Sequence, residues 1–298
     1  MADFLGIADL GVDGLTRVVE LAQSVKSEPA EYSRRLTGAG VGLFFMKPST
    51  RTRVSSEMAA VQLGAHPVIL GQQEVGLGSR ESVADVARVL DRYLDVLAFR
   101  VYSHGVLMEL AEYADAPVIN LLSDAEHPCQ AVADLLTISE ERPIEGATVT
   151  YIGDGNNVCH SLMVGAAMLG ASVRAITPLG YEPASQFVEL ARLMGSGDVT
   201  LTGDVDAVEG SDVLYTDVWA SMGQEVEATQ RAAVFSDYQV DDRMFEAAGE
   251  AAIFLHCLPA HRGDEVTDSV IDHPRSRVFD QSENRLHAFK ALLLAVTE

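Results

Sequence analysis

The stretch from Val41 to Gly64, VGLFFMKPSTRTRVSSEMAAVQLG, constrains the fold more than any other part of the chain. It starts with an apolar run, Val41 to Met46, whose length suits one buried strand. Pro48 and Ser49 end that run, and Ser49 is well placed to cap a following helix. In that helix the apolar residues recur at helical spacing and predict an apolar face, at Val54, Met58 and Val61. The stretch therefore predicts a strand, a tight turn and an amphipathic helix in succession.

The start of this helix is also a candidate anion site. Unpaired backbone N–H groups and the positive end of the helix dipole point at one spot there. The sequence PSTRTR adds charge-assisted hydrogen-bond donors, which are the side chains of Ser49, Thr50, Arg51 and Thr52. A plainer interpretation is a capped helix with solvated arginines. The full PSTRTR run directly after a buried strand favours the anion site.

The rest of the chain alternates short apolar runs with helical patterns. Strands are predicted at HPVIL, DVLAFR, PVIN and TVTYIG, and later at GDVTLTGD, DVLYTDVW and AAIFLHCLP. This order is typical of mostly parallel sheets flanked by helices. The glycine-rich segment Gly71–Arg80 is expected to be a loop, and the polar link SEERPIEGA divides the pattern in two. We expect an α/β protein with domains at 1–142 and 143–280, and a C-terminal helix at 281–298 that packs back on the first domain.

Composition indicates a globular protein without a disulfide framework. The 298 residues suit one large or two medium domains, and no run of roughly 18 or more apolar positions occurs. Cys129, Cys159 and Cys257 are odd in number and far apart, which argues against paired cysteines and a CxxC zinc site. The first residues lack the basic and apolar parts of an export signal, so we expect a cytoplasmic location.

The chain is strongly acidic, with 44 acidic residues, 21 basic residues and a net charge of −23. Such a surface is a poor partner for nucleic acid or anionic membranes. Only Lys26, Lys47 and Lys290 are lysines. At about 1 M ionic strength the Debye length is roughly 3 Å, so the self-repulsion would be screened. We hypothesise an adaptation to concentrated salt; the alternative is an ordinary acidic enzyme.

Polar residues follow several of the predicted strands. In open parallel sheets, ligands bind beyond the carboxyl ends of the strands. Arg100 follows LAF, the segment His127–Gln130 follows PVINLL, Asp217 follows DVLYT, and Cys257 follows AAIFLH. An aspartate at a strand end can pair with a substrate ammonium group. These positions are therefore candidate ligand contacts, although each alone has a plainer structural interpretation.

The segment GDGNN, Gly153–Asn157, opens a helix after a strand and invites a dinucleotide interpretation. It lacks the third glycine of GxGxxG, because Ser161 and Leu162 follow where helix packing would need it. No acidic residue ends the next strand, Val173–Ile176, to bind a ribose. NAD binding is therefore only an alternative.

Five motifs together resemble the aspartate and ornithine carbamoyltransferase family: PSTRTR, HPCQ, GDGNN, DVWASMG and HCLP. They occur in the family's order over nearly the whole chain. DVWASMG and HCLP resemble the ornithine branch, since the aspartate enzymes usually show HPLP. The resemblance implies reversible transfer of the carbamoyl group of carbamoyl phosphate to the side-chain amine of L-ornithine, which gives L-citrulline and phosphate. It also implies that no metal or organic cofactor is needed, and that the chain forms a homotrimer or an assembly of trimers.

The resemblance assigns roles to individual residues. Carbamoyl phosphate would contact Ser49, Thr50, Arg51, Thr52, Arg100, His127, Gln130, Cys257, Leu258 and Arg285. Ornithine would contact Asn157, Asp217, Ser221 and Met222. Arg100 and His127 would stabilise the carbonyl oxygen, where negative charge grows during attack. Cys257, beside Asp217, would orient the attacking nitrogen, whereas Cys129 fills a variable position.

One departure concerns the loop in which some members carry a glutamine or lysine that reaches a neighbouring subunit. Here Gly76 takes that place, with Arg80 as a possible substitute. Three other functions stay open. They are a carbamoyltransferase for aspartate or a modified ornithine, an NAD-binding dehydrogenase, and a catalytically silent protein of the same fold. The physiological direction, citrulline synthesis or arginine degradation, also stays open.

Overall fold

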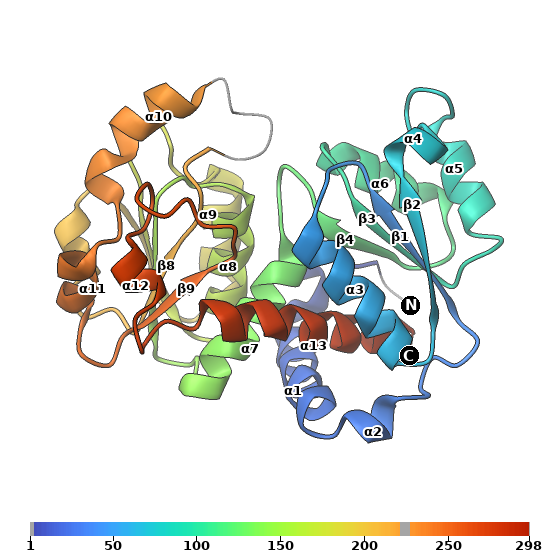
Figure 1. The fold of residues 1–298 in the computed structure, drawn as a ribbon, viewed down its shortest axis with the longest axis horizontal. Coiled ribbons are helices and arrows are strands. Elements are labelled where there is room, and N and C mark those ends of the chain that lie inside the picture. Colours follow the sequence, from blue (N-terminus) through green and yellow to red (C-terminus); the bar gives the residue numbers. More distant parts are fainter. Residues whose placement is uncertain (1–2, 221–226, 298) are drawn as a thin grey trace. The chain divides into compact units, whose positions relative to one another are not determined.

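The computed structural model describes residues 3–220 and 227–297. Within it the chain divides into two compact units, residues 1–136 with 283–298, and residues 137–282 (Figure 1). Each unit is a parallel sheet with helices on both faces, which confirms the predicted fold class. The domain limits at 142 and 280, as limits of ligand-binding parts, stay a prediction.

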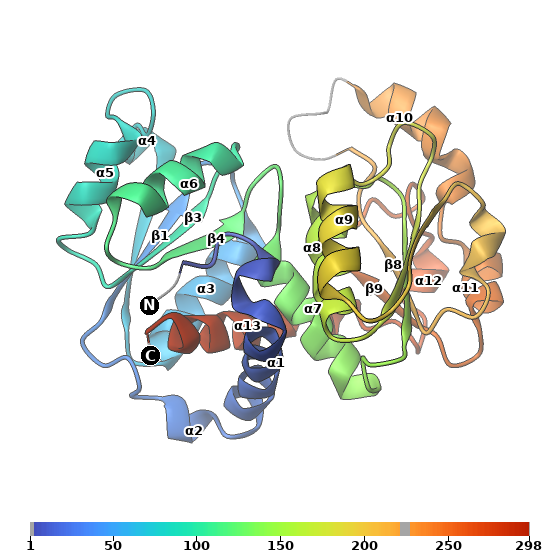
Figure 2. The ribbon, with the colours of Figure 1, turned by 180° about the vertical axis from the view of Figure 1, so that it is seen from behind.

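The first unit is built on a four-stranded parallel sheet in the order β2-β1-β3-β4. Its strands are β1 (Gly40–Phe45), β2 (His66–Gly71), β3 (Val96–Arg100) and β4 (Val118–Leu122). One face carries α5 (Val83–Leu90) and α6 (His104–Tyr113); the other carries α1 (Gly11–Ser27), α3 (Thr50–Gln62) and α13 (Val278–Thr297) (Figures 1 and 2). The remaining elements are η1 (Ile7–Leu10), α2 (Pro29–Tyr32), α4 (Gln72–Val75) and the start of α7 (Pro128–Glu141).

Local sequence explains most of these elements. Ser82 caps α5, since its hydroxyl accepts from the Asp85 N–H at 3.1 Å, and the helix then buries Val83, Val86 and Ala87. These side chains pack in one core with β1 and β3 residues such as Phe44. Both the cap and the buried spacing agree with the sequence prediction.

Helix α3 forms as predicted, but the predicted apolar face is not its buried face. Val54, Met58 and Val61 are 55%, 40% and 49% exposed within the single chain. The side of α3 that packs inward carries small or polar residues: Thr52, Ser56, Ala59 and Ala60. Periodicity identified a stripe on the helix, but it could not say what covers that stripe.

The segment expected to be a loop, Gly71–Arg80, contains the short helix α4. The Glu74 carboxylate accepts from the Gly71 N–H at 2.7 Å and so closes the first turn. Gly76 ends the turn in a left-handed conformation, with φ of 67°. The prediction is therefore wrong over residues 72–75, because a local side-chain cap stabilises a turn in a polar, glycine-rich sequence. Arg80 donates to the Glu74 carbonyl within the same segment.

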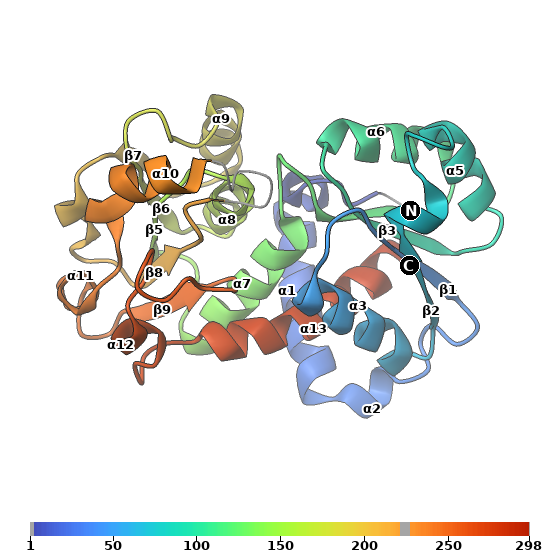
Figure 3. The same ribbon diagram turned by 45° about the horizontal axis from the view of Figure 1, so that its top comes forward.

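The second unit is built on a five-stranded parallel sheet in the order β7-β6-β5-β8-β9 (Figure 3). Its strands are β5 (Thr148–Ile152), β6 (Ser172–Ile176), β7 (Val199–Thr202), β8 (Val213–Thr216) and β9 (Ile253–His256). One face carries α8 (Asn157–Met168) and α9 (Ser185–Met194); the other carries α11 (Asp242–Ala248) and α12 (Asp268–Ile271) (Figures 1 and 2). The unit also contains η2 (Val205–Val208), α10 (Ala228–Phe235) and η4 (Ser236–Tyr238).

The carboxyl ends of the central strands align in both sheets. In the first, Phe45 at the end of β1 pairs with Arg100 at the end of β3. In the second, Thr216 at the end of β8 lies between Ile152 of β5 and His256 of β9. Residues that directly follow these strands are therefore neighbours at one edge of their own sheet.

The C-terminal helix α13 returns to the first unit from Glu283 onward, as predicted. Helix α7 continues to Glu141, so the polar link expected from Glu140 starts two residues later, at Arg142. A search of the described helices finds none with both the length and the apolarity needed to cross a membrane.

Candidate active site

The turn between β1 and α3 has the local structure that the sequence predicts. Ser49 caps α3, with its hydroxyl accepting from the Thr52 N–H at 3.2 Å. The buried Thr52 hydroxyl accepts from Arg100 Nη1 at 3.2 Å and from Arg285 Nη2 at 2.6 Å. Strand β3 supplies one of these guanidinium groups and α13 the other. Two positive charges therefore meet at the first turn of α3.

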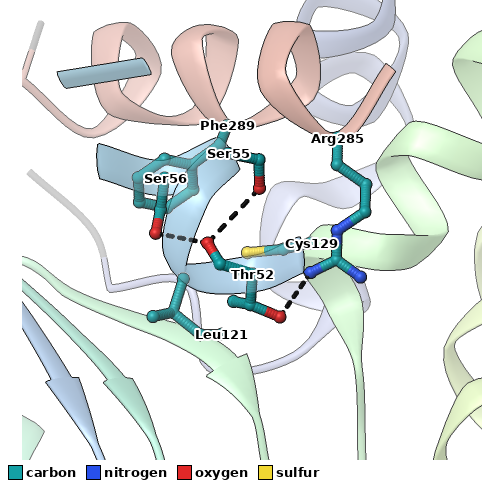
Figure 4. Close-up of a pocket in the computed structure, with 7 residues that line it drawn as sticks. All are labelled: Thr52, Ser55, Ser56, Leu121, Cys129, Arg285 and Phe289. Carbon is teal, nitrogen blue, oxygen red and sulfur yellow. Dashed lines mark hydrogen bonds between the residues drawn. The ribbon is translucent and has the colours of Figure 1, made fainter. Parts of the chain in front are cut away.

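A small pocket opens beside this turn (Figure 4). It is lined by Thr52, Ser55, Ser56, Leu121, Cys129, Arg285 and Phe289. The Ser55 and Ser56 hydroxyls donate back to the Thr52 carbonyl, at 3.3 and 2.6 Å. The Thr52 hydroxyl and the Arg285 guanidinium point toward one another and form the charged part of the lining.

His127 stands at the turn into α7 and is only 4% exposed. Burial, and then the positive charges of Arg285 and Arg100, hold the pKa of His127 well below its ordinary value. The ring is therefore neutral near pH 7, with one N–H donor and one acceptor nitrogen. It can donate a hydrogen bond without adding a further positive charge beside the two arginines.

Two neighbours of His127 are also held in place. The amide of Gln130 donates from Nε2 to Asp134 Oδ1 at 2.7 Å and accepts at Oε1 from Arg285 Nη1. The Cys129 thiol donates to the Asn120 carbonyl at 3.2 Å. Burial raises the pKa of Cys129 to about 12, so it stays a thiol. We call the set Thr52, Arg100, His127, Gln130 and Arg285 the arginine cluster.

In the second unit Asp217 follows β8 and is buried. The Cys257 thiol donates to its Oδ1 at 3.0 Å, and Asn156 Nδ2 donates to its Oδ2 at 2.9 Å. Both oxygens of the carboxylate are thus held by donors from two other strand ends. We call Asn156, Asp217 and Cys257 the aspartate cluster.

Asn156 was not singled out from the sequence, which favoured the next residue, Asn157. Asn156 also caps α8, because its Oδ1 accepts from the N–H groups of Val158 and Cys159 at 2.9 and 3.2 Å. Asn157 is the first residue of α8, and its predicted contact with ornithine stays a prediction. The signal was available, since an asparagine directly before a helix is a typical cap.

Backbone conformation and close packing explain the glycines of GDGNN. Gly153 has φ of 126°, which favours glycine. A Cβ on Gly155 would lie 2.2 Å from the Pro183 backbone nitrogen, so only glycine fits there. Chain packing therefore accounts for Gly155 without a pyrophosphate, which weakens the dinucleotide alternative.

The turn after β9 is fixed by a buried pair that the sequence did not reveal. The Leu258 N–H donates to His256 Nδ1 at 2.9 Å, so the proton of this neutral ring is on Nε2, 3.1 Å from Glu265 Oε1. His256 and Glu265 are both fully buried. Leu258 has φ of 58°, a conformation that a leucine rarely adopts and that is concentrated at functional sites. No spacing rule links Glu265 to His256.

Asp217, His256 and Cys257 offer one ligand atom each within 4.8 Å of one another, as a metal site would. The hydrogen bonds already described occupy each of these atoms. His256 is engaged at both ring nitrogens, and the Cys257 thiol carries the proton that it gives to Asp217. The arrangement is better explained as a hydrogen-bond network than as a metal centre.

A further buried arginine, Arg231 of α10, supports this unit and also escaped the sequence analysis. Its Nη1 donates to Asp154 Oδ2 and to the Trp219 carbonyl, each at 2.9 Å. Its Nε donates to Glu227 Oε2 at 3.1 Å. Burial raises the pKa of Asp154 to about 6, although Arg231 opposes that shift. Arg231 thus joins the GDGNN turn to the chain on both sides of residues 221–226.

The structure brings together most of the residues predicted within each unit. Ser49, Thr50 and Arg51 occupy the start of α3 beside the arginine cluster. Ser221 and Met222, predicted to contact ornithine, lie outside the described residues.

Comparison with known protein families decides the identity. The model for the aspartate/ornithine carbamoyltransferase carbamoyl-P binding domain matches residues 2–140, and the model for the Asp/Orn binding domain of the same family matches residues 145–296. The chain belongs to the aspartate/ornithine carbamoyltransferase family.

Individual relatives agree with the family assignment. The chain is 49% identical over 298 residues to an ornithine carbamoyltransferase of Nostoc punctiforme, covering 99% of this chain and 96% of that one. It is 48% identical to an ornithine carbamoyltransferase of Pyrococcus horikoshii, with 98% and 94% covered. The solved ornithine carbamoyltransferase of Pyrococcus furiosus superposes with a TM-score of 0.94 at 48% identity, with 98% and 96% covered.

Proposed function

We propose that this family member is an ornithine carbamoyltransferase, which transfers the carbamoyl group of carbamoyl phosphate to the side-chain amine of L-ornithine and releases L-citrulline and phosphate. The observation that carries the choice of acceptor is the buried Asp217 carboxylate, held at both oxygens. A buried carboxylate attracts an amine and repels the carboxylate side chain of aspartate. The relatives at nearly 50% identity carry the same name.

The arginine cluster suits carbamoyl phosphate, together with the start of α3. The phosphate would lie at the helix N-terminus, bound by Ser49, Thr50, Arg51 and Thr52, with Arg100 and Arg285 turned toward it. His127 and Gln130 would contact the carbamoyl oxygen and nitrogen. Supporting this are the two guanidinium groups that already meet at Thr52 and the neutral state of His127.

The aspartate cluster suits the acceptor. The uncharged δ-nitrogen of ornithine attacks the carbamoyl carbon, and the negative charge that develops on the carbamoyl oxygen is stabilised by Thr52, Arg100 and His127. As the new C–N bond forms, the C–O bond to phosphate breaks, and the proton lost by the nitrogen leaves with phosphate. Cys257 and the Leu258 carbonyl would orient the reacting groups, and Asn157, Ser221 and Met222 would contact the rest of ornithine.

The acceptor can be tested directly. Purified protein is given carbamoyl phosphate with ornithine, N-acetylornithine, aspartate or a simple diamine, and the ureido product is measured. We expect ureido product with ornithine at a far higher rate than with the others. Activity with aspartate alone would overturn the assignment to ornithine, and no transfer to any amine would favour a silent member of the family.

We further propose that the carbamoyl-phosphate part is residues 1–142, that the ornithine part is residues 143–280, and that the protein assembles as trimers in the cytoplasm. The exposed apolar stripe on α3, Val54, Met58 and Val61, supports association, because such stripes are usually covered in an assembly. Light scattering coupled to size exclusion tests this proposal; a monomer at micromolar concentration would contradict it.

We also propose that the protein requires concentrated salt. The net charge of −23 and the scarcity of lysine support this. Dilution from about 1 M salt to tens of millimolar lengthens the Debye length from roughly 3 Å to more than 10 Å, so acidic groups repel over longer distances. Circular dichroism should then show loss of structure on dilution. Full stability in dilute buffer would contradict the proposal.

A further inference from the structure

Asp134 lies one helical turn beyond Gln130 on α7 and is fully buried. It accepts from Gln130 Nε2 at 2.7 Å, in an i, i+4 pair within the helix. Gln130 itself is only 1% exposed, so water does not compete with either side chain for this hydrogen bond. The family motifs considered in the sequence end at Gln130, and they assign nothing to Asp134.

The two partners of Gln130 fix which way its amide faces. Arginine can only donate, so the atom of Gln130 that meets Arg285 must be the oxygen. The amide nitrogen then faces Asp134, whose carboxylate oxygen accepts from it. A flipped amide would place donors against Arg285 and oxygen against oxygen at Asp134. The donor and acceptor chemistry of its two partners therefore fixes the orientation of the Gln130 amide.

The consequence concerns the carbamoyl group. A carbonyl oxygen has two acceptor lone pairs, so Oε1 can accept from Arg285 and from one further donor. The carbamoyl NH₂ of carbamoyl phosphate is such a donor. Acetyl phosphate has the same shape and charge but carries a methyl group there, which cannot donate.

We propose that Asp134 is a specificity-determining positioning residue, which holds the Gln130 amide with its oxygen toward the substrate and so selects a phosphate ester that carries an N–H donor. This inference rests on the proposed function, because it assumes that Gln130 meets the carbamoyl nitrogen. In this proposal Asp134 acts on the substrate through Gln130. Sites that hydrogen-bond a substrate group reject analogues that lack it far more strongly than apolar pockets reject a methyl group.

The test compares two donors in Asp134→Leu, a change that keeps approximate size and removes both oxygens. Calorimetry without ornithine gives the affinities for carbamoyl phosphate, acetyl phosphate and inorganic phosphate. We expect carbamoyl phosphate to bind about 10- to 100-fold more weakly, as for a lost hydrogen bond to a buried group. Acetyl phosphate and inorganic phosphate should bind as in the wild type. If the leucine variant does not fold, Asp134→Ala is read in the same way.

Two controls separate positioning from a merely structural role. Asp134→Asn keeps an oxygen that can accept from Gln130, and it should restore most of the preference for carbamoyl phosphate. In a Gln130→Leu background, adding Asp134→Leu should change the preference no further. Equal loss for all three ligands, an unchanged preference, or an additive effect in that background would each overturn the proposal. Wild-type transfer to ornithine is measured in the same series, so failure of the proposed function shows separately from failure of this inference.

Discussion

The two units hold their candidate ligand groups with opposite kinds of side chain. The arginine cluster gathers guanidinium groups from β3 and α13 around one hydroxyl at a helix start, with a neutral histidine beside them. The aspartate cluster gathers an amide and a thiol around one carboxylate at the ends of β5, β8 and β9. Under the proposed function, the same strand-end geometry serves an anion in one unit and an amine in the other.

The comparison teaches that the side chains of each cluster, and not the sheet edge that carries them, set the charge of the candidate site. In the first unit Asp134 accepts a hydrogen bond from Gln130 and orients its amide. In the second unit Arg231 donates a hydrogen bond to Asp154 and holds the turn next to Asp217 in place. A buried group of the opposite charge thus supports each cluster, and substitutions can disrupt one cluster without the other.

The largest effect is expected from Arg51→Ala. Loss of a charge-assisted donor to the phosphate group of carbamoyl phosphate should lower kcat/KM for that substrate by about 10³-fold, comparable to loss of a preorganised donor. Steady-state kinetics and circular dichroism measure activity and fold. Arg53→Ala, an exposed arginine on the same helix, is the matched control and should leave activity unchanged. Near-normal turnover of Arg51→Ala would refute the anion site at α3.

Asp217→Asn should have the next largest effect and should act on the other ligand. Removing the charge that attracts the amine should lower kcat/KM for ornithine by about 10²-fold. Binding of carbamoyl phosphate, measured by calorimetry without ornithine, should stay within about twofold, since its phosphate is assigned to charge-assisted donors of the other unit. Asp206→Asn, an exposed aspartate of η2, serves as control. A comparable loss of carbamoyl phosphate binding would break the separation of the two clusters.

Arg231→Met should weaken ornithine use without touching the donor. It leaves Asp154 buried without its guanidinium partner, so KM for ornithine should rise about tenfold and the melting temperature should fall. Replacing Asp154 by Asn in the same chain should recover part of the stability. Arg88→Met, which replaces an exposed arginine beside Asp85 and the Tyr113 ring, provides the comparison and should change neither quantity. An unchanged KM in Arg231→Met would show that the GDGNN turn needs no support from α10.

The smallest expected effect is a difference between the two units in how the free energy of unfolding depends on pH. The pKa of Asp154 is raised from 3.8 to about 6, so the folded protein binds more protons than the unfolded chain between these values, and stability falls as pH rises. The pKa of His127 is lowered from 6.5, so the folded protein binds fewer protons below 6.5, and stability rises with pH. Each slope is at most about 1.4 kcal/mol per pH unit. Urea unfolding of Asp154→Asn and His127→Gln between pH 4 and about 6.5 should show opposite changes of slope; changes of the same sign would contradict the assignments.

Local sequence predicted the fold well because its signals are local. The strand, cap and helix around Ser49 need only residues next to one another in the chain, and the strands and helical spacings elsewhere are equally local. Where the prediction failed, the structure depends on a contact that the spacing of apolar residues does not reveal. The α3 stripe was identified, but its burial depends on what packs against it. The α4 turn depends on one side chain that reaches back to Gly71.

The candidate site divides in the same way. Arg100, His127 and Asp217 could be chosen from the sequence because they lie at the end of a strand or within a few residues of it, and because their motifs resemble those of a family. Asp134 had a readable signal, an acid one turn after Gln130, that was not used. Arg231 and Glu265 had none, since Arg231 is 77 positions from Asp154 and no spacing rule links Glu265 to His256, nine positions away.

By itself the sequence determined the strands, the capped helix at PSTRTR and the identity of the reactive side chains, because these depend on neighbours in the chain and on residue type. Tertiary structure alone decided which oxygen of Asp217 meets which donor, that His127 is uncharged, and that the Gln130 amide faces one way. Those properties arise from burial and from groups brought together by folding, such as Arg285 against Thr52 across 233 positions of the chain. Burial removes water as a competing partner, so in each case the surrounding protein fixes the charge and the direction of the hydrogen bond.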